Sequence, residues 1–138
     1  MFLLDTNVVS ELRKVATGTA DRAVSEWQRA ATGVELFVSV VTLFELEIGV
    51  RQMELRDPRQ GHALRHWFTE KLMPTFSRRV LPIDEIIALR AAAMHVPNRR
   101  SDRDAFIAAT ALVHGMTIVT RNVRDFEGTG VKLINPWE

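Results

Sequence analysis

The sequence predicts one α/β domain over residues 1–138, a three-layer α/β/α arrangement in which helices cover both faces of a mainly parallel sheet. Short apolar runs alternate with one or two helical segments, which is the pattern of a parallel sheet. These runs are apolar throughout, as expected of strands that are buried on both faces. No linker, internal repeat or low-complexity tract interrupts the chain, and its length is that of one domain.

The first strand is predicted at residues 2–4, an apolar run too short for a helix, which ends at Asp5. Helical patterns follow at residues 8–14 and 21–32, separated by the break at Thr17-Gly18, and the second strand is predicted at residues 36–40. Residues 42–55 have the apolar spacing of a helix, with Leu43, Leu46 and Val50 on one face.

The second half of the chain continues the alternation. Asp57-Pro58 is typical of a helix start, and that helix is predicted to run to a break at Pro74. A third strand is expected at residues 80–83, then a helix from the cap Asp84 to about residue 95 and a basic loop at 96–100. Ser101 opens another helix, which ends at the Gly115 turn, and strands are predicted at residues 117–120 and 131–134.

Composition excludes several classes of protein. The 18 basic and 17 acidic residues leave a net charge of +1, so charge alone does not require a nucleic-acid partner. Cysteine is absent, which excludes disulfides and cysteine-ligated zinc. No apolar run approaches a membrane span and the first residues lack the pattern of a signal peptide, so we expect a cytoplasmic protein with no membrane partner.

Four acidic residues are candidates for a shared site: Asp5, Glu45, Asp104 and Asp125. Each also has a structural interpretation. Asp5 follows a strand and precedes a helix, where an aspartate often serves as N-cap. Thr42-x-x-Glu45 has the spacing of a capping box and Ser101-x-x-Asp104 has a similar spacing, while Asp125 suits a turn. Taken one at a time, these residues leave both interpretations open.

Taken together, the four acids favour a metal site. Ligand sites in open parallel sheets lie outside the carboxyl ends of the strands, where Asp5 and Asp125 are expected. Carboxylates that lie within a few ångströms of one another repel, so such a cluster requires a function or a counter-ion. Oxygen ligands without Cys or His select Mg²⁺ or Mn²⁺, and such a site suits reactions of phosphates.

Basic residues flank the later acids and could hold phosphates at the margin of the site; they are Arg99, Arg100, Arg103, Arg121 and Arg124. The alternative is that they are ordinary solvated charges. Glu47 should point to a different side of its helix from Glu45. His62 and His66 have the spacing of a helical metal pair, but no third ligand accompanies them, and an exposed helix face is favoured.

Four motifs in this order resemble those of the PIN-domain ribonucleases, in particular the VapC toxins of type II toxin–antitoxin systems and their FitB-like branch. The motifs are residues 3–7 (LLDTN), 45–49 (ELEIG), 104–111 (DAFIAATA) and 120–126 (TRNVRDF). The resemblance spans essentially the whole chain. One departure lies at residues 98–103 (NRRSDR), where many relatives have a glycine and a proline-rich approach, so the loop and the substrate preference are expected to differ.

The resemblance implies a Mg²⁺- or Mn²⁺-dependent endoribonuclease in which Asp5, Glu45, Asp104 and Asp125 are the metal-site acids. Thr120, Asn122 and Asn7 would be supporting polar groups. It also implies a homodimer and a cognate antitoxin, whose C-terminal segment occupies the active-site groove and through which the complex binds promoter DNA.

Two rival functions follow from the same residues. An aspartyl phosphatase would have Asp5 as nucleophile but would require a second acid at position 7, where the chain has Asn7. A non-catalytic module that only binds RNA or a protein is the other alternative. Clustered negative charge gives no advantage to simple binding of phosphates, so metal-dependent hydrolysis of RNA is favoured.

Overall fold

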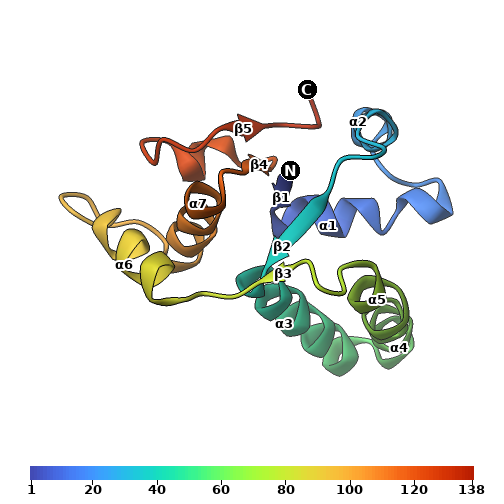
Figure 1. Ribbon diagram of the computed structural model, residues 1–138. Coiled ribbons are helices and arrows are strands. Elements are labelled where there is room, and N and C mark those ends of the chain that lie inside the picture. The colour runs from blue at the N-terminus through green and yellow to red at the C-terminus, as the bar shows by residue number, and fades with distance from the viewer.

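The computed structural model describes all 138 residues, and Figure 1 shows a central sheet with helices on both sides. The five strands are β1 (Phe2–Leu4), β2 (Leu36–Ser39), β3 (Val80–Leu81), β4 (Thr117–Val119) and β5 (Leu133–Ile134). The α-helices are α1 (Thr6–Leu12), α2 (Arg22–Ala30), α3 (Val40–Arg56), α4 (Pro58–Trp67), α5 (Met73–Thr75), α6 (Glu85–Ala93) and α7 (Asp102–His114). Two 3₁₀ turns, η1 (Val15–Thr17) and η3 (Val123–Phe126), and one π-helical turn, η2 (Phe68–Leu72), complete the chain.

The sheet has the order β3-β2-β1-β4-β5, and all of its pairings are parallel. The prediction of a mainly parallel sheet is therefore confirmed. Leu3 of β1 lies opposite Phe37 on one neighbouring strand and Ile118 on the other, so β1 is the middle of the sheet. This position explains why residues 2–4 are apolar throughout.

Consecutive residues of β1 enter the two cores of the three-layer structure. Leu3 belongs to a cluster with Ile107 of α7, on the side where Figure 1 shows α6 and α7. Leu4 belongs to a cluster with Val8 of α1 and Val50 of α3, on the opposite side. Both leucines are fully buried. The predicted α/β/α layering is thus confirmed.

The alternative interpretation of Thr42 and Glu45 as a capping box does not hold, because α3 begins earlier. The Ser39 hydroxyl accepts the backbone N–H of Val41 at 3.0 Å, so Ser39 is the N-cap and Val40 is already helical. Thr42 lies inside the helix and is fully buried. A serine directly after a strand caps the helix as well as a threonine would, and the apolar pattern cannot tell the two apart. Glu45 is consequently not needed as a capping residue.

The predicted break at Pro74 is also wrong, since helical structure continues to Thr75. The π-helical turn η2 changes the hydrogen-bond register before the proline. Pro74 then falls in the first turn of α5. The caps predicted at Asp57 and Asp84 are confirmed, because their side chains accept N–H groups of Gln60 and Ile87.

The strand order places a topological switch point beside β1. From β1 the chain moves outward on one side through β2 to β3, and then crosses to β4 and β5 on the other side. Crevices form at the carboxyl ends of the two strands on either side of such a reversal. Asp5 directly follows β1 and Thr120 directly follows β4, so both lie at this crevice.

Glu47 joins α3 to α4 through Arg65, on a different side of α3 from Glu45, as predicted. The Arg65 guanidinium donates to both Glu47 oxygens, at 2.6 and 2.8 Å, and also to Glu54. Arg51 adds a further bond to Glu47 at 2.7 Å. These arginines lower the pKa of Glu47 to about 2.

We expect Glu47→Gln to lower the free energy of unfolding by about 0.5–1 kcal/mol at neutral pH, because a bidentate pair within a network is lost. The pKa of Glu47 is lower in the folded protein than its value of about 4.5 in the unfolded chain. The stability that Glu47 contributes is therefore fully present above pH 4.5 and is lost as the pH falls toward 2. Denaturant melts from pH 7 down to pH 2 should therefore show the difference shrinking. Glu26→Gln, which breaks an exposed pair with Arg22, is the matched control and should change stability little.

None of the helices combines the length and the apolar character that a membrane crossing requires.

Candidate active site

The switch point opens into a polar cavity of about 520 Å³ that contains all four predicted acids. No hydrophobic residue lines it. The lining residues are Asp5, Thr6, Asn7, Glu45, Ser101, Arg103, Asp104, Asn122 and Asp125. They come from the ends of β1 and β4, from the first turns of α1 and α7, and from α3 and η3. Segments far apart in the sequence therefore contribute carboxylates to one cavity.

Asp5 is fixed at the base of the cavity and is only 7% exposed. One carboxylate oxygen accepts the Thr6 N–H at 2.8 Å, so Asp5 is the N-cap of α1 as its position suggested. The other oxygen accepts the Thr120 hydroxyl at 2.7 Å and the Asn7 amide at 3.2 Å. Burial raises the pKa of Asp5, although these hydrogen bonds act in the opposite direction. Asp5 is thus both the N-cap of α1 and a member of the site.

Glu45 reaches the cavity from the second turn of α3. Its Oε1 accepts the Thr6 hydroxyl at 2.6 Å, and its Oε2 lies 3.6 Å from the Arg103 guanidinium. Thr6 therefore connects Asp5 and Glu45, since its backbone N–H bonds one and its hydroxyl the other. We did not single out Thr6 from the sequence. The signal was its place inside the Asp-Thr-Asn run, between two residues that were singled out.

Asp104 stands in the first turn of α7, where Ser101 is the N-cap and accepts the Asp104 N–H at 3.4 Å. A hydrogen bond with the Ser101 side chain favours the charged form of Asp104, but it is the weakest of the influences on this carboxyl. Burial raises the pKa of Asp104 to about 6, and the negative charges of Asp125, Asp5 and Glu45 add to this rise. This electrostatic coupling indicates that the four carboxylates act on one another across the cavity.

Asp125 is exposed and belongs to the 3₁₀ turn η3 rather than to an irregular loop. Its neighbour Phe126 is 1% exposed and anchors the turn in the core against α7. This anchor holds the Asp125 carboxylate at the rim of the cavity.

The three predicted supporting residues belong to a hydrogen-bond network around Asp5. The Thr120 hydroxyl donates to Asp5 and accepts the backbone N–H of Asn122 at 3.0 Å. The Asn7 amide donates to Asp5, while its carbonyl oxygen accepts the Arg121 N–H at 3.0 Å. Thr120 and Asn7 therefore tie the loop after β4 to the first turn of α1, and Asn122 lines the cavity.

Thr120→Val is expected to destabilise the protein by about 1–3 kcal/mol, because the buried Asp5 oxygen loses its shortest donor. The hydrogen bond from Thr120 lowers the pKa of Asp5, so its loss should raise that pKa further. Thr120→Ser keeps the hydroxyl and is the matched control. Denaturant unfolding of both variants decides the matter: a valine variant as stable as the parent would show that the hydrogen bond from Thr120 does not stabilise the fold.

The predicted basic residues differ in their surroundings. Arg100 is occupied by the protein itself, because its guanidinium donates to the carbonyls of Met94 and Glu127. The Arg121 guanidinium lies over the Trp137 ring, with 5.1 Å to the ring centroid. Arg99 and Arg124 make no hydrogen bond or ion pair through their side chains. Of these arginines only Arg103 lines the cavity.

The donor chemistry of the cavity fits a hard divalent cation. All the acidic donors are oxygens and no Cys or His lines the cavity, which favours Mg²⁺ or Mn²⁺ over zinc. Four carboxylates face one basic residue there, so a dication would relieve the repulsion that raises the pKa of Asp104. In the arrangement observed, no three acidic or histidine side chains are placed to hold one ion together. His62 and His66 are both exposed on α4, as expected.

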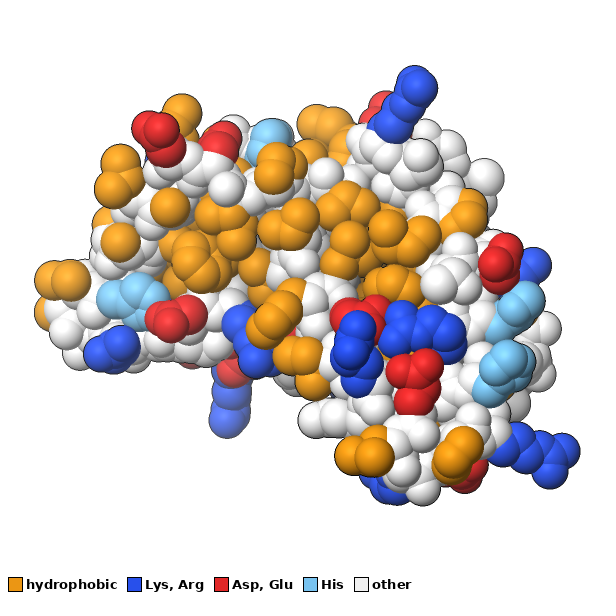
Figure 2. All heavy atoms as spheres, turned by 90° about the horizontal axis from the view of Figure 1, so that it is seen from below, with side chains coloured by type: hydrophobic (Ala, Val, Ile, Leu, Met, Phe, Trp, Pro, Cys, Tyr) orange, Lys and Arg blue, Asp and Glu red, His pale blue; other side chains and the backbone are white.

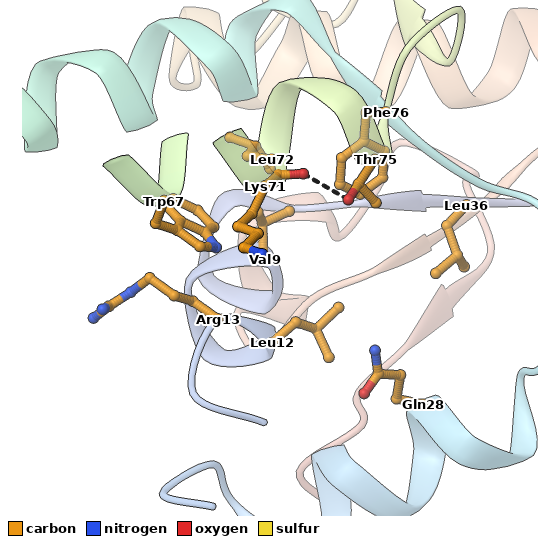
Figure 3. A pocket seen from close by; sticks show the side chains of 10 residues that line it. All are labelled: Val9, Leu12, Arg13, Gln28, Leu36, Trp67, Lys71, Leu72, Thr75 and Phe76. Atoms are coloured by element: carbon orange, nitrogen blue, oxygen red, sulfur yellow. Dashed lines mark hydrogen bonds between the residues drawn. The ribbon is translucent and has the colours of Figure 1, made fainter. Parts of the chain in front are cut away.

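A second cavity of about 200 Å³ has a different character. It lies between α1, α2, β2 and the α4–α5 region, and Figure 3 shows apolar side chains such as Leu12, Trp67 and Phe76 around it. Its polar lining residues are Arg13, Gln28, Lys71 and Thr75, and no carboxylate is present. This cavity therefore has no metal-ligand set.

The PIN domain model matches residues 2–132 of this chain. The chain belongs to the PIN-domain family. It is 35% identical to the VapC ribonuclease Y4jK of Sinorhizobium fredii over 100% of this chain and 99% of that protein. It is 32% identical to the toxin FitB of Neisseria gonorrhoeae over 99% of both proteins.

The fold agrees with the same family. The crystal structure of FitAcB from Neisseria gonorrhoeae superposes with a TM-score of 0.86 and 30% identity, covering 100% of this chain and 99% of that one. The resemblance to PIN-domain proteins of the FitB type, based on four short motifs, is thus confirmed over the whole chain. In this PIN domain each of the four motifs contributes one acid to the polar cavity.

Proposed function

We propose that this PIN domain is a Mg²⁺- or Mn²⁺-dependent endoribonuclease that acts as the toxin of a toxin–antitoxin pair. The observation that carries the proposal is the polar cavity at the switch point, whose acids come from four separate segments and influence one another's ionisation. The full-length relatives named VapC ribonuclease and toxin FitB support the substrate class and the biological role.

The four carboxylates have distinct tasks in this proposal. Asp5 is rigid, held by Thr6, Thr120 and Asn7, and would fix the position of the cation. Asp104, Glu45 and Asp125 surround the same space and would complete its ligand set. The bound cation would supply an activated water and charge stabilisation for the phosphate. Hydrolysis would leave a 5′-phosphate and a 3′-hydroxyl, without participation of the RNA 2′-hydroxyl.

Arginines around the cavity would hold the RNA backbone. Arg124 lies in η3 directly before Asp125, Arg121 precedes that turn, and Arg99 precedes α7. Each is exposed and free to contact phosphates, whereas Arg100 contacts the RNA less directly because its guanidinium is bonded to carbonyls. We propose a peripheral role for these four residues, which affects affinity and its salt dependence rather than the chemical step.

A toxin requires a partner that neutralises it, and we propose a cognate antitoxin whose C-terminal segment enters the cavity and which carries promoter-DNA binding for the complex. We also propose a homodimer. Its support is the exposure of large apolar side chains, among them Phe44, Ile86 and Leu89, which are 55%, 64% and 73% exposed. Figure 2 shows that hydrophobic side chains gather on one face of the molecule. Exposed apolar surface of this kind is typical of a protein interface.

The activity is tested by incubating the purified protein with a mixed-sequence RNA in millimolar Mg²⁺ or Mn²⁺, and in chelator. Cleavage with either metal, loss of cleavage in chelator and 5′-phosphate product ends are expected. Binding without cleavage under all conditions would favour the non-catalytic alternative. Release of inorganic phosphate from small phosphomonoesters, with intact RNA, would favour a phosphatase.

A further inference from the structure

Arg103 occupies a position that electrostatics disfavours for a cation. It lies in the first turn of α7, a helix of 13 residues, between the acids Asp102 and Asp104. The positive end of the helix dipole is located there and favours anions. Two contacts offset this cost. Nη1 of Arg103 lies 3.6 Å from Glu45, and the guanidinium carbon lies 4.9 Å from the centroid of the Phe44 ring.

These contacts position the guanidinium without using its hydrogen-bonding capacity. The distance to Glu45 exceeds that of a hydrogen bond, and Arg103 donates no other bond in the structure. Its side chain is 49% exposed, so the five N–H groups remain available to a ligand. Arg100, by contrast, donates hydrogen bonds from its guanidinium to two backbone carbonyls.

Arg103 also stands between two cavities of different character. It is the only basic residue that lines the acidic cavity. It also lines an adjoining apolar cavity, together with Val40, Phe44, Ile83 and Phe106. The guanidinium thus has the Phe44 ring on one side and the Glu45 carboxylate of the acidic cavity near its Nη1.

We propose that Arg103 binds a phosphate of the RNA inside the cavity, at a position next to the cleaved bond, and that Phe44 positions it for this contact. The inference rests on the proposed ribonuclease function and extends it to a specific substrate-binding residue. An anionic backbone entering a cavity of four carboxylates meets repulsion, and Arg103 is the only positive side chain in the cavity that can offset it beside the proposed cation. A guanidinium presents paired N–H donors, which match two oxygens of one phosphate.

Loss of this contact should weaken binding more than it slows the chemical step. A phosphate next to the cleaved bond is held equally in the ground state and the transition state, so its loss raises KM and leaves kcat nearly unchanged. We expect Arg103→Ala to raise KM about tenfold or more, as befits a charge-assisted pair of hydrogen bonds. Arg103→Lys keeps the charge but loses the fork, so it should recover only part of the affinity.

The test measures both kinetics and binding, with Arg22→Ala as the matched control. Arg22 lies on α2, its side chain is 94% exposed, and its removal changes the net charge equally. Kinetics use the parent background. Binding uses fluorescence anisotropy of a labelled single-stranded RNA on the Asp104→Asn background, at several salt concentrations. Arg103→Ala should lower the slope of log affinity against log salt by about 0.7, the value for one phosphate of a single strand.

Each outcome decides a separate point. If the parent cleaves RNA and Arg103→Ala equals Arg22→Ala in both KM and salt slope, the role of Arg103 is refuted. If no RNA is cleaved under any metal condition but Arg103→Ala still lowers the slope, the ribonuclease proposal fails and Arg103 remains an RNA ligand. Full recovery of KM in Arg103→Lys would refute recognition by the paired donors.

The part assigned to Phe44 has its own variants. Phe44 is more than half exposed, so Phe44→Leu should leave the fold intact while removing the aromatic face. We expect KM to rise about threefold, because a surface cation–π contact is weak. Phe44→Trp should restore it. A KM in Phe44→Leu equal to that of the parent would show that the ring does not position Arg103.

Discussion

Asp104→Asn is expected to lower the rate of RNA cleavage by about a thousandfold or more, since a divalent cation typically contributes several kcal/mol to such a reaction. The substitution keeps the size of the side chain and the helix cap, because Ser101 and not Asp104 is the N-cap of α7. It removes one charge from the cavity. The measurement is the single-turnover cleavage rate of a labelled RNA at saturating Mg²⁺ or Mn²⁺.

The same assay applies to the other acids. Asp5→Asn, Glu45→Gln and Asp125→Asn should each be severely impaired, because all four residues line the same cavity. Glu47→Gln is the internal control, since Glu47 faces Arg65 and Arg51 on another side of α3. An active Asp104→Asn protein would remove Asp104 from the site. An inactive Glu47→Gln protein that is still folded would show that the wrong side of α3 has been assigned.

Asp104→Asn is also expected to stabilise the metal-free protein at neutral pH. The pKa of Asp104 is raised from 3.8 to about 6, chiefly by burial and then by Asp125 and the other two acids. A folded-state pKa above the unfolded value means that stability is fully present below about pH 3.8 and is lost as pH rises through about 6. At pH 7 the parent therefore carries the whole penalty, and the amide carries none.

Thermal melts in chelator at pH 4 and pH 7 measure this difference. The advantage of Asp104→Asn over the parent should be present at pH 7 and should shrink at pH 4. Millimolar Mg²⁺ or Mn²⁺ should raise the Tm of the parent, because a ligand bound only by the folded protein stabilises it. The variant should gain less.

Asp104→Ala distinguishes a residual helix-dipole role from the metal role. If Asp104 serves mainly the helix, both substitutions should lower Tm by a similar amount in chelator and in metal, and the parent should show no metal-dependent shift. That result would contradict the four-acid site.

The convergence of the acids could be predicted because it depends on chain topology. An apolar run that ends on Asp5, and another that ends shortly before Asp125, place both residues at one edge once the strands are parallel. The hydrogen bonds that Thr120 and Asn7 donate to Asp5 agree with their predicted supporting role. Asp5 shows why single residues left alternatives open, since it is both an N-cap and a member of the cavity.

Other features depend on side-chain geometry that periodicity does not encode. The start of α3 at Val40 is decided by the Ser39 hydroxyl, and one apolar residue can end a strand or begin a helix equally well. The continuation past Pro74 requires a π-helical turn. Among five similar arginines, only contacts distinguish Arg103 beside Glu45 from Arg100, whose guanidinium is bonded to backbone carbonyls.

The central claim is that the four acids hold a divalent cation, and anomalous diffraction from crystals grown with Mn²⁺ tests it most directly. We expect an anomalous peak inside the polar cavity, within coordination distance of Asp5 and Asp104, that weakens in crystals of Asp104→Asn. A cavity without a peak at millimolar Mn²⁺, or a peak only at the exposed pair His62 and His66, would contradict the claim.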